Sequence, residues 1–207
     1  MAKTFGNTWW GKSWLNSLDK IDFDNRLPRG RRYANNGSVK NIDLKKNVVT
    51  ARVQGSRPAP YTVKIEIPVF NLTEKKLLLE EVIKNTQVHA ALLNRELSPD
   101  IEKIAAKQKI KIFPVKWSDL EMTCSCPDWA VPCKHIAAVI YQLAETIDRD
   151  PWLLFRLKGI DLEKEFGRED GISASATFNS PKSFFKEAPG KRTNPSNEQD
   201  FLEPGFP

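Results

Sequence analysis

Apolar and polar residues alternate in the first third of the chain, and this pattern predicts an antiparallel β-sheet. Residues 61–67 alternate without a break, as a strand with one buried face does. Residues 38–44 and 48–54 have a similar character and predict a hairpin that turns at residues 45–47. We expect the three segments to form a three-stranded meander.

Apolar residues three and four positions apart predict helices in much of the remaining chain. A short helix over residues 8–18 carries Trp10 and Trp14 on one face, and we expect both rings to pack in the core. The other expected helices cover residues 73–84 with Thr73 as the N-cap, residues 86–97, a segment that starts at Ser98-Pro99, a segment with Pro132 in its first turn, and a segment from Asp150-Pro151 to Gly159. Further short strands are expected at residues 109–113 and 120–123.

The net charge of +6 is concentrated near the N-terminus. Residues 1–60 hold twelve Lys or Arg against four Asp and no Glu, a net charge of +8. Basic residues near aromatic ones are what a nucleic-acid surface requires. The candidates, expected on or beside the strands and their loops, are Arg29, Arg31, Arg32, Lys40, Lys45, Lys46, Arg52 and Arg57. An ordinary solvated surface explains these charges equally well, and without a base-reading motif any binding is expected to be sequence-tolerant and salt-dependent.

All three cysteines lie within ten residues of each other and are followed by one of the two histidines. Cys124, Cys126, Cys133 and His135 are spaced as C-x-C, six residues, then C-x-H. Three thiolates and an imidazole are a complete tetrahedral set for zinc. The first pair suits the end of a strand, where residues two apart point to the same side, and the second pair suits the first turn of a helix. We therefore predict one structural Zn²⁺ ion at these four residues.

Other interpretations of the cluster are weaker. Buried free cysteines are common in protein cores, but they need no histidine and no such spacing. A nucleophilic pair of Cys133 and His135 leaves the other two cysteines unexplained. Four protein ligands close the coordination shell, whereas a catalytic zinc keeps one position for water, so we expect no enzyme. His89, in a predicted helix, is interpreted as an ordinary helix residue.

The cysteine motif and its flanks resemble the SWIM zinc finger. Residues 122–139 and 148–159 are similar to the stand-alone bacterial SWIM proteins, as are residues 8–14, 29–34 and 53–58. The resemblance covers roughly residues 5–160. It implies zinc binding through Cys124, Cys126, Cys133 and His135. It also implies a partnership with a Swi/Snf-type helicase-like ATPase.

These observations predict an α+β fold in four parts. We expect a basic N-terminal region with the antiparallel sheet (1–70), a helical region (71–109), a SWIM zinc finger of short strands and a helix with following helices (110–160), and a disordered tail (161–207). The tail carries Phe184, Phe185, Phe201 and Phe206, which are either incidental or a docking motif. The basic surface is expected to be separate from the zinc site, because it lies far upstream in sequence.

We expect a zinc-binding, non-enzymatic module that binds DNA or RNA, assists a Swi/Snf-type ATPase, or does both. The first alternative is a protein–protein adaptor with structural zinc and no nucleic-acid contact. The second is a zinc hydrolase, which only the metal favours. We expect no small-molecule substrate. The absence of a long apolar run or a signal-peptide pattern, together with clustered reduced cysteines, leads us to expect a cytoplasmic protein without a membrane partner.

Overall fold

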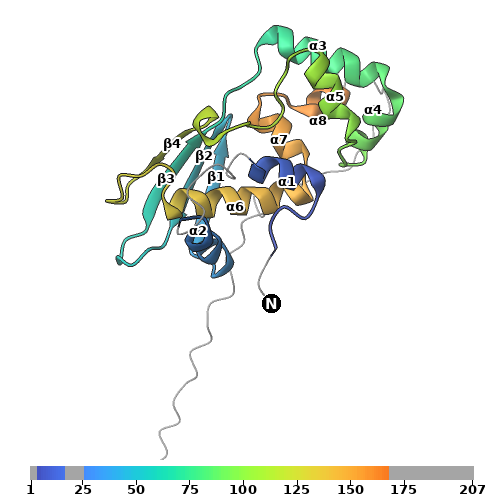
Figure 1. Ribbon diagram of the computed structural model, residues 1–207. Helices are drawn as coiled ribbons and strands as arrows, with labels where there is room; N and C mark the ends of the chain where they lie inside the picture. Colours follow the sequence, from blue (N-terminus) through green and yellow to red (C-terminus); the bar gives the residue numbers. More distant parts are fainter. Residues whose placement is uncertain (1–3, 17–25, 168–207) are drawn as a thin grey trace, which may run out of the picture.

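The computed structural model describes residues 4–16 and 26–167 of the chain. Four antiparallel strands form one sheet in the order β1-β2-β3-β4 (Figure 1). The first three strands are β1 (Val39–Lys45), β2 (Val48–Val53) and β3 (Tyr61–Glu66), which confirms the predicted meander. The fourth, β4 (Glu121–Cys124), comes from the cysteine-rich segment and pairs with β3. The N-terminal region and the cysteine-rich segment therefore share a sheet.

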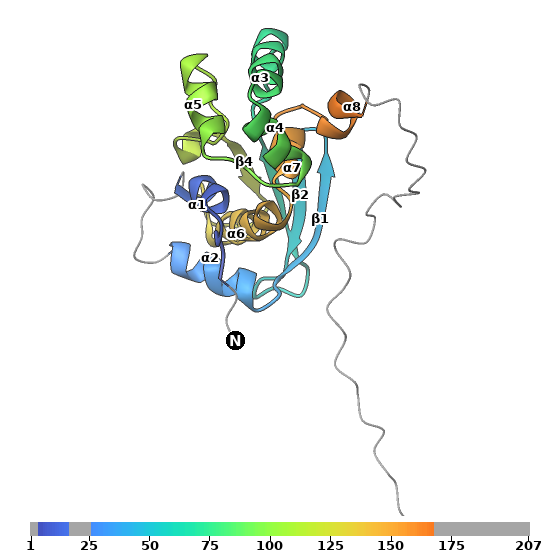
Figure 2. The ribbon, with the colours of Figure 1, turned by 90° about the vertical axis from the view of Figure 1, so that its right-hand side faces the viewer.

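A central helix, α6 (Lys134–Arg149), covers one face of this sheet (Figures 1 and 2). Strand residues alternate so that Ala51, Val63 and Ile65 are fully buried on the covered face. Helices α1 (Trp9–Asn16) and α2 (Arg26–Asn35) pack against α6, with α1 across α6 from the sheet and α2 below α6 in the view of Figure 2. The apolar side chains predicted to make α6 a core helix are all buried: Ile136, Val139, Ile140, Leu143 and Ile147.

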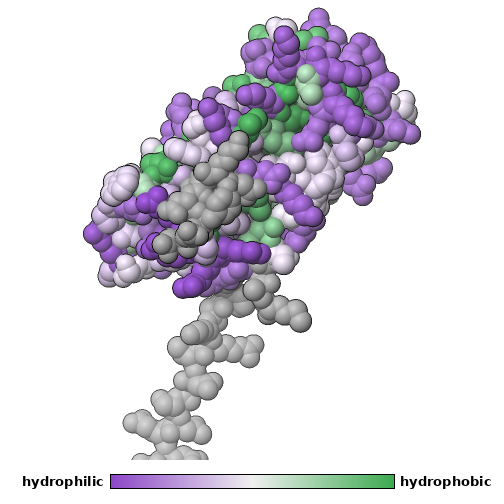
Figure 3. Space-filling view, viewed as in Figure 1, coloured by the Kyte–Doolittle hydropathy of each residue, from purple (hydrophilic) through white to green (hydrophobic). Residues whose placement is uncertain are grey.

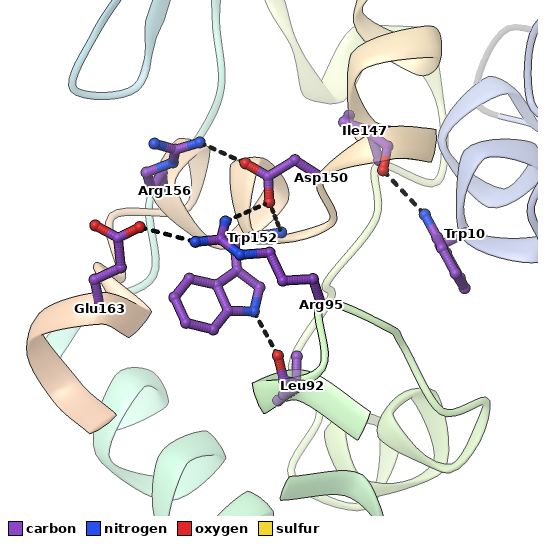
Figure 4. Close-up of polar contacts among 8 residues, drawn as sticks. All are labelled: Trp10, Leu92, Arg95, Ile147, Asp150, Trp152, Arg156 and Glu163. Atoms are coloured by element: carbon purple, nitrogen blue, oxygen red, sulfur yellow. Dashed lines mark hydrogen bonds and ion pairs between the residues drawn. The ribbon is translucent and has the colours of Figure 1, made fainter. Parts of the chain in front are cut away.

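Helix α1 is held to α6 by tryptophan side chains and a carboxylate. Trp14 is fully buried and its indole N–H donates to the carbonyl of Ile140 at 3.3 Å. The Trp10 N–H donates to the carbonyl of Ile147 at 3.0 Å (Figure 4). The Asp148 carboxylate accepts the backbone N–H groups that precede the helix. The prediction that both rings pack in the core is confirmed for Trp14, while Trp10 is partly buried against the core.

The remaining helices gather at the end of the molecule away from the β2–β3 loop (Figure 1). They are α3 (Leu72–Lys84), α4 (Thr86–Leu93), α5 (Asp100–Lys107), α7 (Trp152–Leu157) and α8 (Leu162–Phe166), with a 3₁₀ turn, η1 (Trp117–Asp119), before β4. Asn71 caps α3 through a reciprocal capping box with Glu74, so the prediction that Thr73 is the cap is wrong. Asn85 caps α4 through its side chain alone, by accepting from the Val88 N–H.

An ion-pair cluster joins this helical end to the end of α6 (Figure 4). Asp150 accepts from Arg95 at 3.1 Å and from Arg156 at 2.8 Å. The Arg95 guanidinium lies 4.2 Å from the ring centroid of Trp152, whose indole N–H donates to the carbonyl of Leu92 at 2.7 Å. The cluster thus connects α4, α6 and α7.

Four further sequence-based expectations are corrected by the structure. Residues 29–34 lie in helix α2 rather than beside strands and loops, because Leu27, Gly30 and Ala34 form a face buried against α6. Residues 109–113 form no strand; Lys109 has a φ of 58°, and the Phe113 ring packs against Trp9 instead. Pro132 precedes α6 and does not lie in its first turn, because Cys133 is the N-cap.

The fourth correction concerns the expected tail. Its first residues, 161–167, include helix α8, with Leu162 and Phe166 buried in the core. The ring of Phe166 packs on His89, at 4.8 Å between centroids, which confirms His89 as a packed helix residue. The rest of the tail, which includes Phe184, Phe185, Phe201 and Phe206, lies outside the described residues.

The described residues form one continuous hydrophobic core that runs from Phe5 to Phe166. Hydrophilic residues cover most of the face seen in Figure 3, and hydrophobic ones gather in smaller patches. Among the described helices, none combines the length and the apolar character that crossing a membrane requires.

Candidate metal centre

Strand β4 and the turn after it carry the first two cysteines. Cys124 is the last residue of β4 and lies opposite Val63 in the pairing with β3. The turn is fixed by two hydrogen bonds to Thr62, whose carbonyl accepts from the Ser125 N–H at 3.0 Å and whose N–H donates to Ser125 Oγ at 2.9 Å. Cys126 follows directly, so both thiols lie at the end of the sheet, as the C-x-C spacing predicts.

The start of α6 carries the other two ligand residues. Cys133 is the N-cap of α6 and His135 lies in the first turn. The Cys133 carbonyl accepts the Ala137 N–H at 3.0 Å, which starts the helical hydrogen-bond pattern at this residue. Both side chains are buried, with 0% and 3% of their surface exposed. Helix α6 is the element that covers the sheet, so its first turn meets the end of β4.

The four ligand atoms converge on one point. The Sγ atoms of Cys124, Cys126 and Cys133 and one ring nitrogen of His135 all lie within 4.8 Å of one another. His135 Nδ1 is 3.9 Å from both Cys124 Sγ and Cys133 Sγ. Zinc bonds of about 2.3 Å to sulfur and 2.0 Å to nitrogen place tetrahedral ligand atoms about 3.5–3.8 Å apart. The donor set and its geometry therefore fit one zinc ion, with Nδ1 as the histidine ligand atom.

The imidazole of His135 is held between two tyrosine rings. The Tyr61 ring lies 4.6 Å away and the Tyr33 ring 5.4 Å away, centroid to centroid. Gly55 closes the site, since a Cβ there would lie 2.5 Å from Tyr61 Cε2 and 3.2 Å from His135 Nε2. Nε2 is buried and has no hydrogen-bond partner within the described part of the chain. Ring packing therefore orients this ligand, whereas many zinc-bound histidines are oriented by a hydrogen bond to the second nitrogen.

The three thiols ionise at different pH in the metal-free cluster. The pKa of Cys133 is lowered to about 4, chiefly because the Cys124 thiol donates a hydrogen bond to its thiolate. The pKa of Cys124 is raised by that same hydrogen bond and by burial, and burial also raises the pKa of Cys126. Cys133 is therefore the thiol that loses its proton most readily. Zinc must displace the protons that Cys124 and Cys126 keep.

The comparisons with known proteins agree with this geometry. Residues 114–144 match the family model of the SWIM zinc finger. This segment is a SWIM zinc finger. The match spans η1, β4 and the first part of α6, and it includes all four ligand residues. With four protein ligands, the finger supplies a structural zinc site rather than a position for a catalytic water.

One relative extends over most of the chain. "Uncharacterized protein Rv2102" of Mycobacterium tuberculosis is 40% identical over 174 residues, which cover 82% of this chain and 63% of the relative. The chain thus spans less than two thirds of the length of that protein. No solved structure matches.

Three cation–aromatic pairs surround the SWIM finger and form what we call the zinc-end surface. Arg26, the first residue of α2, has its guanidinium 5.8 Å from the ring of Trp129, which lies in the loop between the second and third ligands. The Lys134 ammonium lies 5.6 Å from the Tyr33 ring. Arg57 lies 6.0 Å from the Tyr61 ring. Tyr33 and Tyr61 are the two rings that hold His135, so this surface is built directly on the metal centre.

Trp129 is the most exposed large apolar residue in the described part of the chain. Its side chain is 89% exposed, and nearby Val131 is 45% exposed. Sequence reasoning missed Trp129, Arg26 and Lys134 as surface partners. The signal for Trp129 was its position inside a tight metal loop, which has little core of its own in which to bury an indole.

The eight predicted basic residues divide into separate groups. Arg57, in the β2–β3 loop, belongs to the zinc-end surface, and Arg29, Arg31 and Arg32 are exposed along α2. Lys45 and Lys46 lie at the β1–β2 turn, at the opposite end of the sheet from Cys124. Lys40 and Arg52 lie on the strands, and Arg52 donates to Thr62 Oγ1 at 2.8 Å. The expectation that basic surface and zinc site are separate is therefore wrong for Arg57, whose guanidinium lies against a ring that packs on His135.

Proposed function

We propose that this protein is a zinc-stabilised, non-enzymatic module that binds single-stranded nucleic acid through the zinc-end surface. The observation that carries the proposal is the indole of Trp129, 89% exposed and next to Arg26. An exposed aromatic ring beside a cation is what stacking on a base with a nearby phosphate requires. Arg57, Lys134 and the arginines of α2 supply further positive charge for the backbone.

In this proposal the role of the zinc ion is to stabilise the fold that carries the binding surface. It joins the end of β4 to the start of α6 and thereby fixes the loop that presents Trp129. The finger then needs no base-reading side chains, and binding is tolerant of sequence and steeply dependent on salt.

Assistance to a Swi/Snf-type ATPase is a further part of the proposal, and it rests on the resemblance to stand-alone bacterial SWIM proteins. A pure protein adaptor is the second candidate, because Trp129 and Val131 together also make an apolar contact of the kind that anchors protein interfaces. Recovery of an ATPase from native cells after nuclease treatment favours the adaptor. Loss of that ATPase with nuclease favours a nucleic-acid bridge.

The direct experiment is a fluorescence-anisotropy titration of labelled single-stranded DNA, single-stranded RNA and duplex DNA with the zinc-loaded full chain. We expect single strands to bind more tightly than duplex, with affinity that falls linearly in log–log form as salt rises. Absence of binding to every probe at low salt would contradict the nucleic-acid function and leave the adaptor.

A further inference from the structure

A polar pocket that contains none of the zinc ligands lies where the β3–α3 linker, the residues between α5 and β4, and the end of α7 meet. Its volume is about 410 Å³, within the range of small-molecule sites. Three lysines line it, Lys109, Lys111 and Lys158, together with Phe70 and the carboxylates of Glu74 and Asp119. Lys109 and Lys111 come from one segment and Lys158 from another about fifty residues later, so the fold brings the three together.

Lys158 is the unusual member of this pocket. Only 6% of its surface is exposed, and burial lowers the pKa of its ammonium. Its Nζ lies 5.3 Å from the Phe70 ring centroid, and it forms no ion pair with any residue that the structure describes. The charges of Glu74 and Asp119 act in the opposite direction and raise the pKa of Lys158, but neither carboxylate pairs with it directly. A buried ammonium without a direct anionic partner is costly and is rarely found.

The two carboxylates of the pocket are already engaged. Glu74 accepts the Asn71 N–H at 2.8 Å as part of the α3 capping box. Asp119 accepts the N–H groups of Val115 and Lys116 at 3.0 Å and 3.3 Å. Neither forms an ion pair with a lysine of the pocket within the described residues. Three lysines and two carboxylates therefore line the cavity, and the carboxylates hydrogen-bond to backbone N–H groups rather than to the lysines.

We propose that this pocket binds a small molecule through an anionic group, phosphate or carboxylate, received by Lys158 with Lys109 and Lys111. The anion neutralises the buried ammonium, and Phe70 gives the rest of the ligand an apolar wall. The pocket shares no residue with the zinc-end surface, so anion binding can be tested independently of nucleic-acid binding.

The test measures the thermal midpoint of the zinc-loaded full chain in inorganic phosphate and in acetate, each against chloride at equal ionic strength. We expect phosphate or acetate to raise the midpoint of the wild type, and the more effective of the two identifies the anionic group. Lys158→Met is expected to abolish this rise, while its midpoint in chloride is equal to or above that of the wild type. Lys76→Met, which removes an exposed charge of α3 outside the pocket, is the matched control and keeps the full rise.

If Lys158→Met does not fold, Lys111→Met tests the pocket in its place. Lys111 is exposed on the pocket rim, so its replacement leaves the core intact. We expect it to weaken phosphate or acetate binding at least several-fold. An equal rise in the wild type and in the folded pocket variants, or no rise in any of them, overturns the proposal, because the anions then act only as general salts. A rise lost equally in Lys76→Met also overturns it.

Discussion

Cys124 lies directly opposite Val63 in the pairing of β4 with β3. A zinc ligand is therefore an integral residue of the sheet that the N-terminal third of the chain builds. Because Cys133 and His135 open α6, the metal joins this sheet to the helix that covers it. The zinc finger is thus part of the main hydrophobic core rather than a separate small domain attached to it.

Loss of a ligand is expected to destabilise more than the finger. Cys133→Ala removes one thiolate, and metal binding free energy in such sites is folding free energy. We expect less than stoichiometric zinc by elemental analysis and a loss of at least about 4 kcal/mol of stability. For a chain of this size that is a fall in the thermal midpoint of roughly 8–16 °C.

The control for this prediction is Thr123→Ala, an exposed residue of the same strand, which is expected to keep both zinc and midpoint. A protein whose midpoint is unchanged in strong chelator contradicts a structural role for the metal.

Zinc binding is expected to release two protons at pH 7 rather than three. Cys133 is already a thiolate, because its pKa is lowered to about 4, whereas the raised pKa values of Cys124 and Cys126 keep these two as thiols. Affinity for zinc therefore rises with pH, on the order of 100-fold per pH unit between pH 7 and 8. Calorimetric titration in buffers of different ionisation enthalpy counts the protons, and a count of three shows that Cys133 is not pre-ionised.

Sequence reasoning identified the metal site because all four ligands lie within one short segment. Their spacing also placed them correctly at a strand end and a helix start. The hairpin and the third strand were predictable for the same reason, since period-two alternation is local.

Features that depend on distant partners were not predictable. Helix α2 has four arginines, a proline and a glycine, and its short apolar face is stabilised only by packing against α6. The alternating residues 109–113 resemble a strand, but their side chains pack against other elements, as Phe113 does on Trp9. The zinc-end surface and the lysine pocket each combine residues far apart in sequence.

Close packing of α2 on α6 depends on Gly30. A Cβ at this position would lie 2.5 Å from the Ala137 Cβ and 3.2 Å from the backbone of Ala137 and Ala138. We expect Gly30→Ala to push the helices apart and lower the free energy of unfolding in urea by about 1–3 kcal/mol. Arg31→Ala, on the exposed side of α2, is expected to change it by less than about 0.5 kcal/mol. Equal effects of the two variants would show that this contact is not tight.

The ion-pair cluster at the helical end makes a second stability prediction. Asp150→Ala removes a carboxylate partner from Arg156 and from Arg95, which keeps its pair with Glu163, and it leaves the backbone N–H of Trp152 without its side-chain acceptor. We expect a loss of about 2–4 kcal/mol in urea unfolding, because the Asp150 side chain is only 16% exposed. Asp161→Ala breaks the exposed pair with Lys164 and serves as the control, with an expected loss below about 1 kcal/mol. Similar losses in the two variants would contradict a special role for this cluster.

The exposed indole tests the central claim most directly. Binding of zinc-loaded wild type, Trp129→Ala and Leu72→Ala to labelled single-stranded nucleic acid is measured by anisotropy in one buffer. Leu72 is 85% exposed on α3 and is the matched control for loss of an exposed apolar side chain. We expect Trp129→Ala to weaken binding by about 1–3 kcal/mol, or roughly 5- to 150-fold, with zinc content and midpoint unchanged. Leu72→Ala is expected to bind like the wild type. Equal affinity of Trp129→Ala and wild type would contradict the proposal that the zinc finger presents a base-stacking surface.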